Sequence, residues 1–363
     1  MCGSVSVYME YKNILITGGA GFVGSNLAIK LKTDFPDINI TVLDNLKRRG
    51  SELSLSRLKN AGIDFVHGDI RNREDLIFEN VDLLLECSAE PSVLAGIDSS
   101  PDYLLNTNLV GTLNCLELAR KHGAASLFLS TSRVYPISYI NSLEFEETST
   151  RFNILDDQKI TGASSKGIAE NFPLDAPRSL YGTTKLASEM VVAEYIDTYG
   201  MKAIVNRCGV ITGPWQMGKI DQGVFVLWIA KHYFNQSLSY IGYGGEGKQV
   251  RDFIHIDDLY RAIKLQLENF DEYDSKTFNI GGGVDNSVSL QELTKLCQEV
   301  TGNTIEIDSV YEDRPADLRF FITDSSKFLT QSGLSWEKNA KQTVQDIFEW
   351  IRDNEKALNS ILN

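Results

Sequence analysis

The first half of the chain alternates short, continuously apolar segments with segments of helical periodicity. The apolar segments predict strands at residues 13–17, 38–44, 63–69, 81–89 and 127–131. Since polar residues do not alternate within them, each is typical of a parallel strand covered on both faces. The segments between them, such as 24–35 and 108–123, predict helices. This order predicts right-handed βαβ units and an α/β fold with a Rossmann-type, doubly wound parallel sheet.

The pattern changes after Tyr135, where a long segment is charged and turn-forming and has little periodicity. An insertion at about residues 139–180 is expected over the carboxyl ends of the strands, where ligands bind in such sheets. We expect it to form part of a substrate pocket or a lid; a surface elaboration or an oligomer contact is the alternative.

Regular patterns resume beyond the insertion. Residues 181–200 predict a helix and residues 202–211 a strand. The C-terminal third mixes short strands with helices. One of these helices, at 289–300, opens with Ser289 and Glu292 at capping-box spacing.

Composition limits the classes of protein that the chain can be. Its 363 residues are 42% hydrophobic and 23% charged, as in an ordinary soluble protein, and suffice for one large or two closely joined domains. No apolar run approaches the roughly 20 residues of a membrane span, and MCGSVSVYMEYK at the N-terminus lacks the features of a secretory signal. Five cysteines without metal-ligand spacing predict free thiols in the cytoplasm and no metal site. The net charge of −14 argues against nucleic acid as a partner.

A glycine-rich turn, ITGGAGFVGSN, follows the first predicted strand and opens a helix. Gly18, Gly21 and Gly24 have the spacing that allows a tight turn, close approach to a pyrophosphate and close packing of helix on strand. The helix N-terminus supplies unpaired N–H groups to the phosphates. The turn therefore predicts a dinucleotide site.

Acidic residues at two strand ends extend this site. Asp44 lies 20 residues beyond Gly24, where a carboxylate can accept hydrogen bonds from the adenosine ribose and repel a 2′-phosphate. This favours NAD over NADP, although cations at 47–49 follow closely. Asp69 and Ile70, after the third strand, are placed to meet the adenine.

Tyr181 and Lys185 lie four residues apart in YGTTK, on one helix face and about 6 Å from each other. A lysine ammonium beside a phenol stabilises the phenolate and lowers the pKa of the phenol. The pair becomes a candidate catalytic site because a dinucleotide turn precedes it and the hydroxyl residues Ser130, Thr131 and Ser132 end the fifth strand.

These motifs, in this order, resemble the extended short-chain dehydrogenase/reductase family, which acts on nucleotide-activated sugars. The resemblance rests on TGGAGFVGS, Asp44, GDI, STSRVY and YGTTK, and continues through RDFIHIDD, FNIGGG and DRPADLRF. It implies an NAD-binding Rossmann domain at 1–213 and about 250–272. A smaller, discontinuous nucleotide-sugar domain would comprise 214–249 and 273–363.

The resemblance also implies roles for individual residues. Tyr181 is the general base, Lys185 its partner, and Thr131, four residues before Tyr135, the third catalytic group. The implied NAD contacts are Gly18, Gly21, Phe22, Val23, Gly24, Asp44, Asn45, Asp69, Ile70, Ser88, Ala89, Asn108, Ser130, Tyr181 and Lys185. The implied substrate contacts are Glu90, Ser132, Arg133, Arg207, Gln222, Arg251 and Arg314.

The chemistry that the resemblance implies is oxidation and re-reduction of a sugar carbinol. Dehydratases of the family carry Asp-Glu directly after the Ser or Thr, whereas this chain has Ser132 and Arg133. Neither can act as that acid–base pair, so dehydration is not expected. Arg133 could hold a substrate phosphate or the insertion.

STSRVYP, PRSLYG, DQG and GKQVRD resemble the branch that inverts C2 of CDP-activated deoxyhexoses. Val210 and Glu90 depart from common family patterns near the expected sugar pocket. A 4-epimerase or 4-reductase acting on a UDP-, GDP- or dTDP-sugar is the alternative, and a non-catalytic NAD-binding scaffold is a third. The family resemblance implies a homodimer or homotetramer formed by the helices that carry Asn108 and Tyr181.

Overall fold

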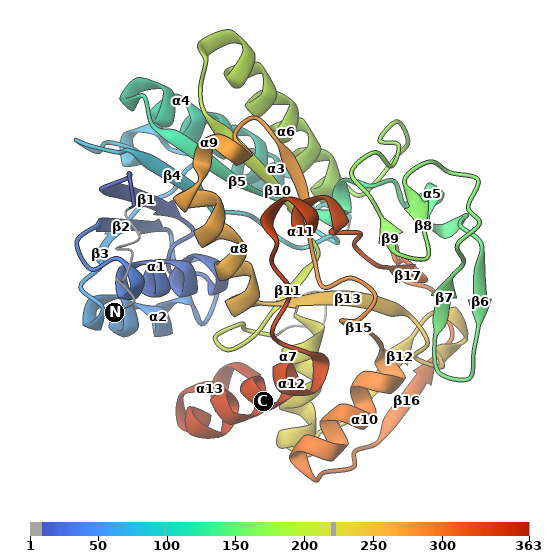
Figure 1. Cartoon of the computed structure of the whole chain (residues 1–363). Helices are drawn as coiled ribbons and strands as arrows, with labels where there is room; N and C mark the ends of the chain where they lie inside the picture. Colours follow the sequence, from blue (N-terminus) through green and yellow to red (C-terminus); the bar gives the residue numbers. More distant parts are fainter. Residues whose placement is uncertain (1–8, 98, 219–222, 363) are drawn as a thin grey trace, which may run out of the picture.

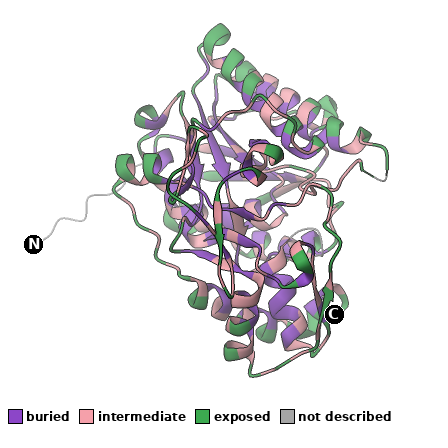
Figure 2. Ribbon diagram, turned by 90° about the vertical axis from the view of Figure 1, so that its right-hand side faces the viewer, coloured by how far each residue is buried: buried purple, intermediate pink, exposed green. Residues whose placement is uncertain are grey.

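The computed structural model describes residues 9–97, 99–218 and 223–362. The chain forms a large lobe around a central sheet and a smaller lobe built mainly from its C-terminal part (Figure 1). Buried residues concentrate in the strands and on the inward faces of the helices (Figure 2). Within the described ranges, no helix combines the length and apolar character needed to cross a membrane.

The large lobe contains a seven-stranded, wholly parallel sheet in the order β14-β10-β5-β4-β1-β2-β3. This is the Rossmann order extended by one strand, so the predicted fold class is confirmed. The strands are β1 (Asn13–Thr17), β2 (Asn39–Asp44), β3 (Asp64–His67), β4 (Leu83–Glu86), β5 (Ala125–Thr131), β10 (Ala203–Cys208) and β14 (Thr277–Ile280).

Helices cover both faces of this sheet. Ile14 and Ile16 of β1 pack in one core with α1 (Phe22–Asp34) and α8 (Ile256–Glu268). Leu15, on the opposite face, packs in a second core with α4 (Thr112–His122) and α6 (Leu180–Tyr199). Shorter helices of this lobe are α2 (Ser54–Asn60), α3 (Asp102–Leu105), α9 (Phe270–Tyr273), α11 (Ser326–Ser332), the π-helix η3 (Asn106–Gly111) and the 3₁₀ turns η1 (Ser51–Leu53), η2 (Arg73–Asp75) and η4 (Ser132–Val134).

The smaller lobe has its own apolar core and two small sheets. One sheet contains β11 (Val210–Thr212), β13 (Val250–His255), β15 (Ser287–Ser289) and β17 (Phe320–Phe321); the other pairs β12 (Leu238–Ile241) with β16 (Ile307–Val310). The helices are α7 (Val224–Tyr233), α10 (Leu290–Thr301), α12 (Ala340–Asp353) and α13 (Glu355–Leu362), with the 3₁₀ turn η5 (Tyr243–Gly245). The capping box at Ser289 and Glu292 is formed as predicted.

Two predicted boundaries differ in the structure. The strand predicted at 202–211 divides at Gly209, because β10 ends in the large sheet and β11 pairs with β13 in the smaller lobe. A Cβ at Gly209 would lie 2.8 Å from the Thr323 hydroxyl, so the crossing passes close to another segment. Conversely, β14 lies within 273–363, the range predicted for the smaller domain, yet it is an edge strand of the large sheet.

The insertion at 139–180 is more ordered than its sequence suggests. It contains two short hairpins, β6 (Phe145–Glu147) with β7 (Phe152–Ile154) and β8 (Ala163–Ser164) with β9 (Gly167–Ile168). Its first residues belong to α5 (Ile137–Asn141). Its apolar residues share a core with β17. The Arg319 guanidinium, just before β17, lies against the rings of Phe145 and Phe152 of the insertion and of Tyr243 in η5. Its carbon is 4.3 Å from the Phe145 ring centre. The insertion is therefore attached to the segment that ends in β17.

Candidate functional site

The glycine turn after β1 forms a cradle that larger residues cannot enter. A Cβ at Gly18, which has φ +65°, would lie 2.8 Å from the backbone of Cys87, the residue after β4. A Cβ at Gly24 would lie 2.4 Å from the Gly18 carbonyl oxygen. Gly21 is the N-cap of α1 and supplies no side-chain cap, so the first N–H groups of the helix stay available for a ligand. This geometry fits a pyrophosphate.

Substitution of Gly24 by alanine provides a test of this cradle. Because the added methyl group would meet the Gly18 carbonyl, helix and turn must separate, and we expect NAD affinity to fall by at least about tenfold. The NAD content of the purified protein, measured after acid release, gives the result. Gly62→Ala is the control: a Cβ there meets nothing within 4 Å, and its φ of +70° should cost only about 1 kcal/mol of stability. Full NAD content in Gly24→Ala would contradict the assignment.

Asp44 and Asp69 line a cavity of about 270 Å³ beside this turn, together with the predicted contacts Gly18, Gly21, Asn45, Ile70, Ser88 and Ala89. Asp44 accepts hydrogen bonds from the backbone N–H groups of Ala20 (3.1 Å) and Leu46 (2.8 Å), which oppose the rise in its pKa caused by burial. Burial opposes ionisation of Asp69 too, but hydrogen bonds from Arg71 and Asn45 outweigh it and lower its pKa to about 2. Carboxylates thus occupy the predicted adenosine end.

The same cavity contains residues that the sequence did not single out. The Tyr103 ring has the Lys47 ammonium 2.7 Å from its centre and the Arg71 guanidinium carbon 4.6 Å from it. Glu90, predicted to contact substrate, lines this cavity rather than the larger one. No local pattern marks Tyr103, because its partners come from distant loops.

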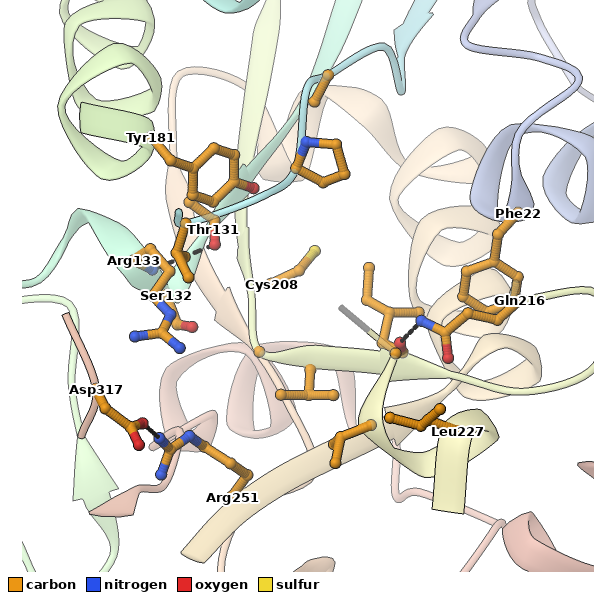
Figure 3. Close-up of a pocket in the computed structure, with 18 of the residues that line it drawn as sticks. Phe22, Thr131, Ser132, Arg133, Tyr181, Cys208, Gln216, Leu227, Arg251 and Asp317 are labelled. Carbon is orange, nitrogen blue, oxygen red and sulfur yellow. Dashed lines mark hydrogen bonds and ion pairs between the residues drawn. The ribbon is translucent and has the colours of Figure 1, made fainter. Parts of the chain in front are cut away.

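Thr131 and Tyr181 line a larger cavity of about 640 Å³ (Figure 3). Lys185 lines the same cavity. Thr131 is the last residue of β5, while Tyr181 and Lys185 lie in the first turns of α6. The Ser179 hydroxyl caps this helix by accepting a hydrogen bond from the Gly182 N–H (3.1 Å). This cap fixes the residue at which α6 begins, and with it the position of Tyr181 in the first turn.

Burial raises the pKa of the Tyr181 phenol, and two groups oppose this effect: the Thr131 hydroxyl through a hydrogen bond, then the charge of Arg133. Arg133 is thus a cation that favours the phenolate, in addition to Lys185, for which the sequence predicts this effect. The Lys185 ammonium lies 3.9 Å from the centre of the Phe128 ring. Burial lowers its pKa, while Glu86 is the acid that most favours its charged form. The role of Lys185 as the catalytic partner of Tyr181 stays a prediction.

Asn108 is buried and joins the loop that carries Glu90 to α6. Its side-chain oxygen accepts a hydrogen bond from the Glu90 N–H (2.7 Å), and its amide donates to the Glu90 carbonyl (3.0 Å) and the Thr184 hydroxyl (3.3 Å). It lies in the π-helix η3, a geometry often found at functional sites. In this structure Asn108 positions the Glu90 loop against α6.

Arg207 lies behind the larger cavity and does not line it. Its guanidinium forms a bidentate ion pair with the Glu189 carboxylate, with N···O distances of 2.7 and 3.1 Å. Both side chains are less than a tenth exposed. Glu189 also accepts a hydrogen bond from the Ser130 hydroxyl, and Arg207 donates to the Tyr135 hydroxyl (3.2 Å). The sequence had predicted a substrate contact for Arg207, but the structure places its guanidinium in a buried network that does not line the cavity.

The remaining predicted substrate residues surround the larger cavity. Ser132, Arg133, Arg251 and Arg314 all line it, and so do the predicted cofactor residues Phe22, Val23 and Ser130. Gln222 lies outside the described residues. No residue of the insertion at 139–180 is among the lining residues, so the structure does not place it over the cavity as a lid.

Sequence reasoning missed the far wall of this cavity, formed partly by Trp228, Lys231 and Gln249. Lys231 directly follows seven apolar residues, 224–230. A lysine at the end of such an apolar run could have marked Lys231 as a candidate binding residue. Among described residues, no group of three or more potential metal ligands is present.

A phosphate cradle beside a Thr–Tyr–Lys group is the arrangement of dinucleotide-dependent enzymes that oxidise or reduce a carbinol. Residues 14–281 match the model of the NAD dependent epimerase/dehydratase family, and the chain belongs to this family. It is an enzyme of the group that acts on nucleotide sugars, and its cofactor is NAD. The glycine cradle and Asp44 fit that cofactor.

Relatives with defined activities cover almost the whole chain. CDP-paratose 2-epimerase of Salmonella typhi is 32% identical over 350 residues, or 93% of this chain and 98% of that protein. dTDP-glucose 4,6-dehydratase of Mycobacterium tuberculosis is 28% identical over 94% of each chain. The structure of UDP-glucose 4-epimerase from Thermotoga maritima with UDP-glucose matches with a TM-score of 0.76 and 26% identity, over 94% of this chain and 99% of that one.

Proposed function

We propose that this enzyme inverts C2 of a CDP-activated hexose or deoxyhexose, using bound NAD. The observation that carries the proposal is the 32% identity to a CDP-paratose 2-epimerase over 93% of the chain. The site supports it, because Ser132 and Arg133 line the cavity directly after Thr131. Neither side chain can protonate a leaving hydroxyl and then remove a C5 proton, as a dehydratase requires.

The residues of the site suffice for an oxidation followed by a reduction. Bound NAD supplies the acceptor for a hydride and returns it. Tyr181, as the phenolate, accepts the proton of the C2 hydroxyl while the Thr131 hydroxyl hydrogen-bonds the same oxygen. After the keto sugar has turned in the cavity, Tyr181 gives the proton back to that oxygen. Protons and hydride balance over the cycle, so no added cofactor is consumed.

The test uses the protein with no added cofactor and CDP-, UDP-, GDP- and dTDP-hexoses, with the C2 and C4 protons followed by NMR. Inversion at C2 of a CDP-sugar alone is the expected result. Inversion at C4 would contradict the proposal and favour a 4-epimerase. Parallel samples with NADH or NADPH detect a 4-reductase, and silence in every sample from NAD-loaded protein would favour a scaffold.

We also propose that the enzyme forms a homodimer through α6 and the adjoining helices α3 and η3. Met190 on α6 is 65% exposed, and Leu105 on α3 and Val110 on η3 are 37% and 41% exposed. An apolar helical face of this kind is typical of an interface. We expect Met190→Glu to halve the mass measured by light scattering, since it buries a charge. Met190→Leu is the control, and an unchanged mass for Met190→Glu would contradict this interface.

A further inference from the structure

Arg133 and Tyr181 belong to one compact unit of backbone. The Arg133 N–H donates a hydrogen bond to the Thr131 side-chain oxygen at 3.2 Å. A Cβ on Gly182 would lie 2.0 Å from the Arg133 carbonyl oxygen, so the turn η4 packs directly on the first turn of α6. The backbone segments that carry Arg133 and Tyr181 are therefore fixed relative to each other.

The Arg133 guanidinium lies between Tyr181 and the Arg251–Asp317 pair, pointing toward that pair (Figure 3). One of its nitrogens donates to the Ala316 carbonyl at 3.3 Å. Among the described residues this is its one hydrogen-bond acceptor, whereas a guanidinium has five N–H donors. Several donors thus remain for a ligand in the cavity.

The loop that carries Ala316 is itself held in place. Asn141 of α5 donates to the Asp317 carbonyl (3.2 Å) and accepts from the Arg319 N–H (3.2 Å). Ala316 has φ +59°, a left-handed conformation that a non-glycine residue adopts only when its surroundings impose it. The acceptor that orients Arg133 is therefore fixed from the side of the insertion.

Positive charge exceeds negative charge at this end of the cavity. Among the described lining residues, Arg133 and Arg251 are accompanied here by one acid, Asp317, which is paired with Arg251 at 2.9 Å. Burial lowers the pKa of Arg133 to about 10, and the charge of Arg251 acts in the same direction. A diphosphate would compensate this excess of positive charge.

We propose that Arg133 binds the phosphate attached to the sugar and so holds C2, rather than C4, at Tyr181. C2 is bonded to the anomeric carbon that carries this phosphate, whereas C4 lies across the ring. Because Arg133 and Tyr181 share one rigid unit, a phosphate on Arg133 keeps the phosphate-bearing edge of the sugar near the phenol. Presenting C4 instead would move the phosphate away from Arg133. This inference rests on the proposed C2 epimerase function and names the residue that selects the reacting carbon.

Binding of CDP and CMP to Arg133→Met, measured by calorimetry on NAD-loaded protein, tests the phosphate contact. CDP carries the terminal phosphate that CMP lacks. We expect Arg133→Met to weaken CDP binding by about tenfold or more and CMP binding by less than about twofold. Arg133→Lys should recover part of the CDP affinity, because an ammonium supplies charge without the planar fork. Arg352→Met, on the exposed face of α12, is the matched control and should change neither affinity.

Equal losses for CDP and CMP, or no loss for either, would overturn the phosphate contact. The choice of carbon is tested separately by the ratio of C2-inverted to C4-inverted product, which should fall in Arg133→Met relative to wild type. An unchanged ratio would overturn the role in selection. The two failures are distinguishable, because C4 inversion by the wild type would reject the proposed function whatever Arg133 binds.

Discussion

Replacement of Tyr181 by phenylalanine is expected to lower kcat by about 10³-fold, within the range for loss of a general acid–base. The ring stays in place, so the fold and NAD content should be retained. Epimerisation followed by NMR under saturating substrate gives the rate, and thermal unfolding gives the stability.

Tyr195→Phe provides the matched control for this variant. It removes a hydroxyl from the same helix, where Tyr195 donates to Glu117 at 2.6 Å and does not line either cavity. We expect a loss of about 1 kcal/mol in stability and an unchanged kcat. If Tyr181→Phe retained more than about a tenth of wild-type kcat, the phenol could not be the base.

The pH dependence follows from the same group. The phenolate is the active form, so kcat/KM should rise with pH through the pKa of Tyr181 as the phenol loses its proton. Burial raises that pKa, the Thr131 hydrogen bond and Arg133 oppose the rise, and Cys208 and Glu90 add to it. Removal of the Arg133 charge must therefore move the ascending limb to higher pH.

Removal of Glu189 is expected to have the largest effect on stability. Arg207 would lose its carboxylate while remaining buried, and breaking a buried ion pair on one side costs about 3–5 kcal/mol. Ser130, the residue before Thr131, would lose its hydrogen-bond acceptor as well. We expect Glu189→Ala to lower the free energy of unfolding by this amount in urea titrations.

Glu299→Ala is the control, because the Lys341–Glu299 pair is well exposed at 68% and 57%. We expect Glu299→Ala to lower the free energy of unfolding by less than about 0.5 kcal/mol. Replacement of both buried partners, in Glu189→Leu with Arg207→Met, should recover much of the stability lost in Glu189→Ala, since no charge is left unpaired. A loss below about 1 kcal/mol in Glu189→Ala would show that water reaches Arg207.

Features with local causes were predictable. The five N-terminal strands were visible as continuous apolar runs, and the glycine turn was visible because its steric requirements act over seven residues. The capping box at Ser289 was equally visible, since both of its hydrogen bonds join residues three apart. These features place one end of the site, because parallel strands bring their carboxyl ends to the same edge.

Features with distant causes were not predictable. No local pattern indicates that Glu189 binds Arg207, or that the charge of Arg133 acts on the Tyr181 phenol. The insertion contains too little periodicity to indicate that it packs on β17. Each outcome depends on a partner far away in the chain.

The sequence by itself therefore determined the fold class, the dinucleotide turn and the identity of the residues that can act as base and hydrogen-bond donor. Periodicity, turn sterics and helix spacing are properties of neighbouring residues, and the chain carries them wherever it folds. Only the tertiary structure decided which cations face the cavity and which are neutralised behind it. Whether a cation faces the cavity or is neutralised depends on its burial and on its distance from an opposite charge. Both are set only when separate segments of the chain pack together.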